Sequence, residues 1–502
     1  MNHLSTFILA HDIGTSGVKA TLFNSFGDLV DSFTTNYQTY FMKKNEVEQN
    51  PEDWWKAICH ATKHLLDTNK ITPINIEVIT FSGQMMGVVP VDKEVNPIRK
   101  ALIWADMRAS QQADHACEEF GEDHLYQLTG NKMTSSYSGA KMAWLKENEP
   151  TSYHKSYKLL QAKDYIVAKL TGNFLTDFSD VSGTNLYDIC KKDWMKELIH
   201  FWGLDIAKLP EVVSSTTIAG YIKEEIADQI GLLSGTPVVI GGADGACAAL
   251  GAGITQIGDT FNYLGSSSWI AGVSDTPILD KQKRTFNFIH LDHSKYLPMG
   301  TMQAAGNLIN WVITEWYKEL AEENKSKAIE IMNQEINDST IGARQLVFLP
   351  YLLGERSPWW NADIKASILG LTAEHQRGDI ARAAMEGISF NLSLIYDALI
   401  ESGLKADNMW LFGGGANSPI WRQMLSDLYN IPLTIPHDVN ETTSKGAAIV
   451  GGIGVGLIDG FNEAKKWSNQ DFLVQPNQET KEAYGIAKNQ FIQAFHATKA
   501  LF

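Results

Sequence analysis

Residues 7–33 read FILAHDIGTSGVKATLFNSFGDLVDSF, and this stretch indicates the fold. It holds three apolar runs typical of buried strands, separated by polar turns that contain glycine: 7–10, 18–23 and 29–33. No helical periodicity lies between the runs. The chain is therefore expected to open as a meander of three strands. A helix over 51–69 should follow, because this segment begins with a proline and two acidic residues.

The opening pattern recurs near the middle of the chain. Strands and helices alternate through the apolar runs at 76–81 and 236–240, and a strand, a polar turn and a strand then return at 260–273. The recurrence predicts an α/β protein of two related halves, 1–252 and 253–502. Further elements are expected in the second half: strands at 345–349 and 409–412, helices at 377–400, from Pro419 and at 444–454, and a helical tail from Lys465.

The length and the net charge of the chain limit the classes of protein to which it can belong. A chain of 502 residues exceeds the size at which one core stops growing, about 250–300 residues, so two domains are expected. Hydrophobic residues make up 44% and charged residues 20%, which argues against disorder. The formal net charge of −16 and the lack of a Lys/Arg cluster argue against nucleic acid and anionic membranes as partners.

The cysteines and the hydropathy pattern indicate a compartment. None of the four cysteines lies in a CxxC pair, so neither a zinc site nor a redox motif is predicted, and reduced thiols in a cytosol are expected. The N-terminus lacks a basic segment followed by a long apolar one, and no stretch of about 18 apolar residues occurs. We expect a cytoplasmic protein without a membrane segment.

Three turns rich in Gly, Ser and Thr follow apolar strands, at 12–17, 265–268 and 413–418. Such turns expose backbone N–H groups and hydroxyls that can bind phosphate oxygens. Neither GxxxxGK[ST] nor an early GxGxxG occurs, which disfavours a P-loop and a dinucleotide-binding fold. One such turn alone is ordinary turn chemistry, but three together favour a nucleotide polyphosphate in a cleft.

Two acidic residues and one lysine have two interpretations each. Asp12 is either the side chain of an Asx turn or a ligand, through water, of Mg²⁺ on the phosphates. Asp244 is either a helix cap or a general base that accepts a hydroxyl proton during phosphoryl transfer. Lys19 either points outward from its strand or reaches a phosphate.

The chain resembles the FGGY carbohydrate kinases in the order and spacing of seven segments: 12–19, 47–51, 82–85, 104–108, 242–245, 350–356 and 413–418. The resemblance implies two ribonuclease-H-like domains of the actin/hexokinase ATPase type with a cleft between them. It places ATP and Mg²⁺ mainly on the C-terminal domain and a sugar mainly on the N-terminal domain. Dimers are common in this family, which leaves a homodimer open.

The resemblance also assigns roles to residues, with Asp244 as the catalytic base and Asp12 close to the metal. Nucleotide contacts are implied for Asp12, Gly14, Thr15, Ser16, Lys19, Gly265, Ser266, Gly306, Asn310, Gly414, Gly415, Asn417 and Ser418. Substrate contacts are implied for Gln84, Met85, Met86, Trp104, Asp106, Arg108 and Asp244. A non-catalytic sugar sensor on this fold is disfavoured, because the expected base and phosphate turns are all present.

The motifs divide between two substrates. Met86 stands where xylulokinases and gluconokinases usually have a histidine, and it cannot donate the same hydrogen bond. Residues 354–361, GERSPWWN, resemble gluconokinases, whereas 82–84 and 263–269 resemble xylulokinases. The balance favours an ATP-dependent kinase that phosphorylates a primary hydroxyl of D-gluconate to give 6-phosphogluconate, with D-xylulose as the alternative substrate.

The charge of gluconate adds one expectation. Its carboxylate would need a cation or several N–H donors in a cleft that is poor in water. Arg108 is the candidate cation, unless it pairs with Asp106 or another acid. Glu355 and Arg356 are expected to form an ion pair that shapes a loop near the cleft.

Overall fold

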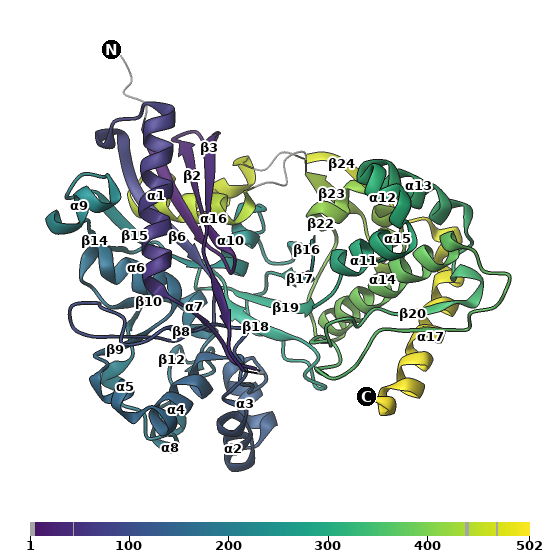
Figure 1. Cartoon of the computed structure of the whole chain (residues 1–502), viewed down its shortest axis with the longest axis horizontal. Coiled ribbons are helices and arrows are strands. Elements are labelled where there is room, and N and C mark those ends of the chain that lie inside the picture. The colour runs from purple at the N-terminus through teal and green to yellow at the C-terminus, as the bar shows by residue number, and fades with distance from the viewer. Residues whose placement is uncertain (1–5, 44, 437–440, 468–469) are drawn as a thin grey trace.

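The predicted meander forms one side of a six-stranded sheet in the computed structural model, which describes residues 6–43, 45–436, 441–467 and 470–502 (Figure 1). Neighbouring strands β3, β2 and β1 are antiparallel, while β1, β6 and β15 are parallel. In spatial order the strands are β14 (Ile218–Tyr221), β15 (Pro237–Ala243), β6 (Ile76–Gly83), β1 (Phe7–Ile13), β2 (Gly17–Asn24) and β3 (Leu29–Asn36).

A seven-stranded sheet in the second half repeats this arrangement. Its antiparallel strands β19, β17 and β16 are followed by β22 and β23, which run parallel to β16. This matches β3, β2, β1, β6 and β15 of the first sheet, so the two halves share a strand order. The strands are β18 (Phe286–Ile289), β19 (Tyr296–Met302), β17 (Ser268–Gly272), β16 (Thr260–Leu264), β22 (Met409–Phe412), β23 (Leu433–Pro436) and β24 (Gln470–Val474).

Helices cover both faces of each sheet. The outer face of the first sheet carries α1 (Pro51–Asn69), α6 (Ala162–Thr171) and α9 (Glu224–Ile230). Between the two sheets lie α10 (Asp244–Gly251) and α16 (Thr442–Gly454). The outer face of the second sheet carries α11 (Gly306–Trp316), α12 (Lys318–Glu323), α13 (Lys325–Asp338), α14 (Arg377–Glu401), α15 (Pro419–Tyr429) and α17 (Lys481–Thr498).

The alternation of side chains along β1 explains why the first residues of this strand, 7–10, are all apolar. Leu9 packs in the core beneath α1 and α6, while Ile8 and Ala10 pack on the other face against α10 and α16. All three side chains are fully buried. A parallel strand that is covered on both faces requires such a continuous apolar run.

The helix α16 belongs to the second half of the sequence but packs against β1, β6 and β15 of the first sheet (Figure 1). It crosses α10 at very short range, because a Cβ atom at Gly446 would lie 1.9 Å from the carbonyl oxygen of Cys247. Only glycine permits this approach of the two backbones. The crossing therefore joins the two halves through their main chains.

The segment after α16 departs from the predicted helical tail. Residues Phe461–Trp467 form a 3₁₀ helix, β24 then adds an edge strand to the second sheet, and only α17 is a long helix. The apolar run 472–474 was too short for a helix and ends before Pro476, which is a strand signal that the sequence analysis missed. The paired residues of β23 and β24 include Leu433 and Val474.

Shorter elements enlarge both halves. Figure 1 shows those of the first half extending below its sheet. They are β4 (Thr39–Phe41), β5 (Val47–Gln49), β7 (Val89–Val91), β8 (Ala101–Leu102), α2 (Ser110–Phe120), α3 (Glu122–Thr129), α4 (Ser138–Asn148), α5 (Pro150–Lys155), β9 (Lys158–Leu160), β10 (Leu175–Asp177), α7 (Phe178–Ser182), β11 (Tyr187–Asp188), β12 (Asp193–Trp194), α8 (Lys196–Phe201) and β13 (Glu211–Val213), with β20 (Val347–Leu349) and β21 (Ser367–Leu369) in the second half.

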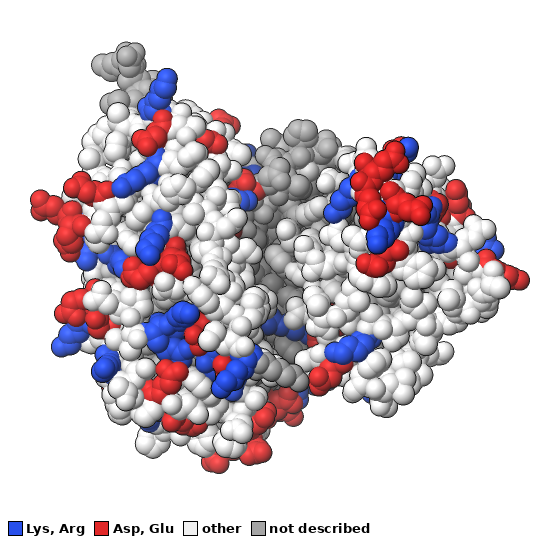
Figure 2. All heavy atoms as spheres, in the orientation of Figure 1, with Lys and Arg blue, Asp and Glu red and all other residues white. Residues whose placement is uncertain are grey.

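Two surface properties bear on the class of protein. On the face shown in Figure 2, Lys and Arg side chains are interspersed with Asp and Glu over both lobes. Within the described parts of the chain, no helix is both long and apolar enough to cross a membrane.

Candidate active site

The carboxyl ends of three parallel strands bring the predicted acidic residues together. Asp12 on β1 and Gly242 on β15 both pair with Ser82 of the intervening strand β6. Asp244 follows β15 directly and is the first residue of α10. Because parallel strands end at the same edge of a sheet, Asp12 and Asp244 face the same space.

A cavity of about 360 Å³ opens at this edge and is lined by both halves of the chain. We call it the first cavity. The first half contributes acidic, aromatic and thioether side chains, and the second half contributes aromatic and polar ones. Its walls include Asp12, Gly14, Thr15, Met85, Met86, Trp104, Asp244, Gly245, Ser267, Trp269, Phe286, Phe288, Met299, Gln303, Arg356 and Thr443.

The environment of the two carboxylates favours proton transfer near neutral pH. Burial and, secondly, the negative charge of Asp12 raise the pKa of Asp244 to about 7. Burial also raises the pKa of Asp12 to about 6, against the opposing effects of Ser82 and Lys19. The backbone N–H of Gly245 donates to Asp244 Oδ1 at 2.7 Å and fixes that carboxylate. Asp244 can therefore exchange a proton at physiological pH.

The turn between β1 and β2 is held by side chains from elsewhere in the first half. Trp104 Nε1 donates to Thr15 Oγ1 at 2.9 Å, and Gln49 Nε2 donates to the Thr15 carbonyl at 2.6 Å. The Tyr37 hydroxyl donates to the carbonyl of Gly14. These bonds occupy the carbonyls of the turn.

A guanidinium from the second half also lines the first cavity. Arg356 donates from Nη2 to Ser136 Oγ at 2.9 Å and lies over the ring of Trp104 at 5.8 Å. The expected ion pair with Glu355 is absent among the described residues, because Glu355 Oε1 instead accepts from the backbone N–H groups of Gln303 and Arg356. Burial lowers the pKa of the Arg356 guanidinium.

A second cavity of about 560 Å³ lies beside the Gly265 turn, entirely within the second half. We call it the second cavity. One side is apolar, from Ile309, Ile313 and Met332, and the other is formed by glycines and small polar residues. Its walls include eight residues predicted to contact nucleotide: Gly265, Ser266, Gly306, Asn310, Gly414, Gly415, Asn417 and Ser418.

The two turns at the second cavity are packed against neighbouring backbone. The N–H groups of Gly306 and Ala305 donate to the carbonyls of Gly265 and Ser266, which fixes the start of α11 on the Gly265 turn. Gly413, at φ +90°, has space for no Cβ, since that atom would lie 2.6 Å from the Leu264 carbonyl oxygen. Both turns therefore require glycine.

Asp106 and Arg108 do not line either cavity. The Arg108 guanidinium bonds to both carboxylate oxygens of Asp106, and its Nη2 lies 2.8 Å from Glu48 Oε1. Asp106 Oδ2 also accepts from the N–H of Val47 at 2.7 Å. The alternative expected from the sequence, a structural ion pair, is what the structure contains.

Three other predicted contacts also lie outside the cavity walls. Lys19 Nζ lies 3.1 Å from Glu441 Oε1, which joins the two halves. Gln84 is buried and donates to Gln49 Oε1 at 2.8 Å, so it supports the residue that holds the Thr15 carbonyl. Ser16 is exposed at the tip of its turn.

Met86 has an unusual backbone conformation for its position in the first cavity. Its φ is +64°, and both its backbone groups are bonded by buried side chains. The N–H donates to Gln161 Oε1 at 2.7 Å, and the carbonyl accepts from Lys141 Nζ at 2.9 Å. Non-glycine residues in this region of φ need such fixed surroundings.

A buried ion cluster lies beside β15, the strand that ends directly before Asp244. Lys163 Nζ lies 2.7 Å from Asp164, 3.2 Å from Asp177 and 3.2 Å from Asp180, and all four side chains are shielded from solvent. Asp177 Oδ2 accepts from Ser179 Oγ at 2.5 Å, and that hydroxyl accepts from the N–H of Ala243 at 2.9 Å. The cluster thus reaches the residue that precedes Asp244.

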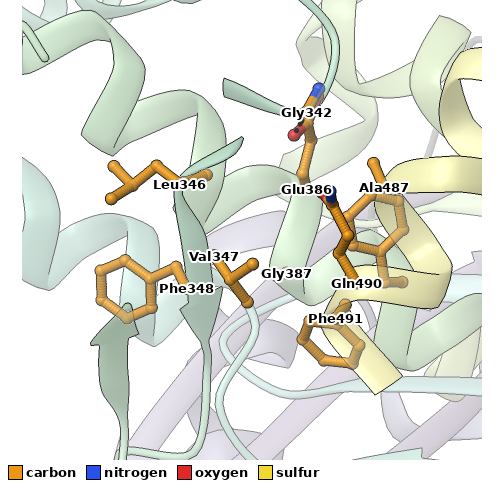
Figure 3. Close-up of a pocket in the computed structure, with 11 residues that line it drawn as sticks. Gly342, Leu346, Val347, Phe348, Glu386, Gly387, Ala487, Gln490 and Phe491 are labelled. Atoms are coloured by element: carbon orange, nitrogen blue, oxygen red, sulfur yellow. Dashed lines mark hydrogen bonds between the residues drawn. The ribbon is translucent and has the colours of Figure 1, made fainter. Parts of the chain in front are cut away.

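Another cavity, of about 10 Å³, lies far from the strand ends, between β20, α14 and α17 (Figure 3). Val347, Glu386 and Phe491 are among its lining residues. It has room for about one water molecule and is a packing gap rather than a substrate site.

Several residues that line the first cavity were not predicted as site residues from the sequence, including Trp269, Phe286, Gln303 and Thr443. Trp269 and Phe286 lie on two strands, Gln303 lies in a loop and Thr443 lies on α16, and no local pattern marks which side of an element faces a cavity. Arg356 did carry a signal, since it lies in the stretch 354–361 that separates the two substrate classes.

Two lobes with one strand order, enclosing adjoining cavities, place this fold with sugar kinases of the actin/hexokinase ATPase type. Comparison with known sequences gives the family. Residues 7–251 match the N-terminal domain, and residues 261–455 the C-terminal domain, of the FGGY family of carbohydrate kinases. The chain belongs to this family, whose members transfer phosphate from ATP to a sugar.

Relatives of both expected specificities are similar to the chain. The xylulose kinase of Staphylococcus xylosus is 33% identical, over 95% of this chain and 97% of the relative. The gluconokinase of Bacillus subtilis (strain 168) is 29% identical, over 97% and 95%. A solved gluconate kinase from Lactobacillus acidophilus gives a TM-score of 0.91 at 25% identity, covering 98% of each chain. A solved xylulose kinase from the same species gives 0.92 at 25%, covering 99% of each.

Proposed function

We propose that this enzyme transfers the γ-phosphate of ATP to a primary hydroxyl of D-gluconate. The observation that carries the proposal is the first cavity, which holds a carboxylate with a pKa near 7 at one wall and a guanidinium at the other. The hydroxyl to be phosphorylated belongs beside Asp244, and the acid group of the sugar belongs beside Arg356. The alternative acceptor, D-xylulose, is supported by the 33% identity to a xylulose kinase.

Asp244 is proposed as the general base. Its carboxylate accepts the hydroxyl proton as the oxygen attacks phosphorus, and its bond from the Gly245 N–H keeps it oriented. Gly14 and Thr15 line the first cavity, and the backbone N–H of Thr15 can bind oxygens of the transferred phosphate. The N–H of Gly14 instead donates to the Gly17 carbonyl at 3.0 Å and holds the turn closed. Aligned reactants in a cavity closed by two lobes supply the rest of the rate.

The second cavity is proposed as the nucleotide site. A purine base fits the apolar side formed by Ile309, Ile313 and Met332, and the glycines leave space for the sugar and phosphates. Ser266 lines the second cavity and its neighbour Ser267 lines the first, so we expect the γ-phosphate to pass this turn toward Thr15. The division of the sequence at 252/253 follows from the same assignment, with the base in the first half and the nucleotide in the second.

The residues present fit a bound Mg²⁺ ion. Asp12 Oδ1 is buried and has no hydrogen-bond partner among the described residues, as expected for an oxygen reserved for a ligand. Mg²⁺ would supply charge neutralisation on the phosphates, with Asp12 holding it through water. A homodimer and a cytoplasmic location stay predictions.

The substrate is tested by ADP release from purified enzyme with ATP, Mg²⁺ and one acceptor at a time. D-gluconate is expected to give a kcat/KM at least about 10-fold above that of D-xylulose, a difference of about 1.4 kcal/mol. L-xylulose, D-ribulose and glycerol complete the panel, and a reaction without acceptor gives the background. A clear preference for D-xylulose would reverse the assignment and leave the kinase mechanism intact.

Replacing Gly306 by alanine is expected to raise the KM for ATP by about 5- to 150-fold, while the KM for the sugar changes little. A Cβ atom there would lie 2.5 Å from the carbonyl oxygen of Gly265 and displace the turn at the nucleotide cavity. Initial rates at varied ATP measure the effect. Gly485→Ala on α17 is the matched control, since no atom lies within 4 Å of its Cβ position. An unchanged KM for ATP would contradict the nucleotide assignment of this turn.

A further inference from the structure

The first cavity is lined by two acidic side chains and one basic side chain. Asp12 and Asp244 provide two carboxylates at the strand ends, and Arg356 is the only Lys or Arg side chain among the lining residues that the structure describes. This cation comes from the second half, whereas both carboxylates come from the first half. A ligand that fills the cavity can therefore meet both acidic groups and a guanidinium.

The Arg356 guanidinium has no acidic partner within the described chain. Among the described residues its side chain donates to the neutral hydroxyl of Ser136, so most of its five N–H donors remain for a ligand. Arg108 instead pairs with Asp106 and Glu48, and Arg99 pairs with Glu48 and Glu149. Arg356 is thus set apart from its neighbours by the missing counter-ion.

Glu355, the acidic residue next to Arg356 in the sequence, does not form an ion pair with its guanidinium. Glu355 is 4% exposed and directs Oε1 at the N–H groups of Gln303 and Arg356. Burial raises the pKa of Glu355 to about 8, so this carboxyl is mostly neutral at pH 7. A half-buried guanidinium without a counter-ion is costly, and an anionic ligand removes that cost.

A second cation lies behind the same wall. Lys141 is fully buried and donates to the carbonyls of Ser136 and Met86, the residue beside Arg356 and a residue of the cavity wall. The Ser136 hydroxyl that accepts from Arg356 is held by a separate bond, because Ser136 Oγ donates to the Trp104 carbonyl at 2.9 Å. The guanidinium is therefore held in position before a ligand arrives.

We propose that Arg356 binds the carboxylate of an open-chain sugar acid, so that this kinase selects aldonates over neutral sugars and polyols of the same length. A carboxylate pairs with a guanidinium through two parallel hydrogen bonds, which a neutral terminal hydroxyl cannot reproduce. This inference rests on the proposed function, because it assumes that the acceptor lies in the first cavity beside Asp244. It also means that the acceptor contacts both lobes, with its charged end held by the nucleotide-binding half.

The test compares two acceptors that differ at one carbon. D-gluconate carries a carboxylate at C1 and D-glucitol a hydroxymethyl group, with the same chain otherwise. Arg356→Gln removes the charge and keeps N–H donors that can reach Ser136. It is expected to lower kcat/KM for D-gluconate by about 10- to 100-fold, mostly through KM, while kcat/KM for D-glucitol changes less than about 3-fold.

Three controls make the result specific. Arg356→Lys keeps the charge and should recover part of the preference for D-gluconate. Arg99→Gln removes a guanidinium that is paired with Glu48 and Glu149 and should leave the ratio between the two acceptors unchanged. Thermal unfolding of each variant shows whether the fold is retained.

Several outcomes would overturn the inference. An equal loss with both acceptors, or a raised KM for ATP alone, would place Arg356 at the transferred phosphate. If the KM for D-gluconate is unchanged in Arg356→Gln, the proposed contact between Arg356 and the carboxylate is wrong. If the wild type phosphorylates neither acceptor, calorimetry with D-gluconate decides. If Arg356→Gln binds D-gluconate about 10-fold or more weakly than the wild type does, the carboxylate site is supported although the proposed reaction has failed. If the wild type does not bind D-gluconate, the carboxylate site is overturned together with the proposed reaction.

Discussion

Replacing Asp244 by asparagine is expected to lower kcat by about 10²- to 10⁴-fold, the range that a positioned general base contributes. The amide keeps the size of the side chain but cannot accept the hydroxyl proton. Steady-state ADP release with saturating ATP and sugar measures the change. Asp193→Asn, at an exposed carboxylate outside both cavities, controls for the change of an acid to an amide.

The fold should survive this substitution. The pKa of Asp244 is raised on folding, so the folded state disfavours the ionised form, and the ionised side chain lowers stability as pH rises above about 4. Asparagine removes that charge, and the Tm at pH 7–8 should be equal to or above that of the wild type. A variant that keeps more than about a tenth of the turnover would contradict the assignment of the base.

The same carboxylate predicts the direction of the pH profile. The base must be ionised to accept a proton, and burial together with the charge of Asp12 holds its pKa near 7 in the free enzyme. The kcat/KM for the sugar should therefore rise with pH and level off above about 7. In Asp244→Asn the residual rate should lose this dependence.

Replacing Lys163 by methionine is expected to lower the free energy of unfolding by about 3–5 kcal/mol, because it leaves three buried carboxylates without their cation. The three acids raise the pKa of Lys163, so its charge persists at every pH at which the protein is folded. Burial raises the pKa of Asp180 well above its usual range, which shows how poorly this site tolerates further negative charge.

Urea unfolding of the wild type and of this variant measures the loss. Lys169→Met is the matched control on the same helix, since Lys169 pairs with Glu52, which is partly exposed, and should contribute at most about 1 kcal/mol. If Lys163→Met does not accumulate as folded protein, the double variant Lys163→Met with Asp180→Asn should recover part of the folded yield. A variant that unfolds at the urea concentration of the wild type would show that the cluster does not need its cation.

The sequence predicted the strands and helices that have strong local signals. The bounds of α1, β16 and β22 agree with those expected, because a proline start or a short apolar run between turns marks each of them. The short apolar run 472–474 before Pro476 was a local signal for β24, but only the fold shows that this run pairs with β23 as an edge strand. Pairing of this kind cannot be read from one segment alone.

The residues of the candidate site also fall into those that a local sequence pattern predicts and those that only the fold brings together. The glycine turns and the acids at strand ends could be found, since a turn and a strand end are local features. The pair of Arg108 with Asp106 was one of the two alternatives that the sequence offered, since the two residues are neighbours. The contact with Glu48 could not be predicted, because it lies 60 residues away and only the fold shows that the two meet. The role of Arg356 depends on a missing partner, which no local pattern records.

The position of α16 has a consequence for how the chain is made. On the ribosome, β15 is complete at Ala243, but the helix that covers its inner face begins only at Thr442, about 200 residues later. At about 5–20 residues per second, the inner face of the first sheet lacks that cover for about 10–40 s of synthesis. The N-terminal half can therefore reach its native packing only when the nascent chain is almost finished.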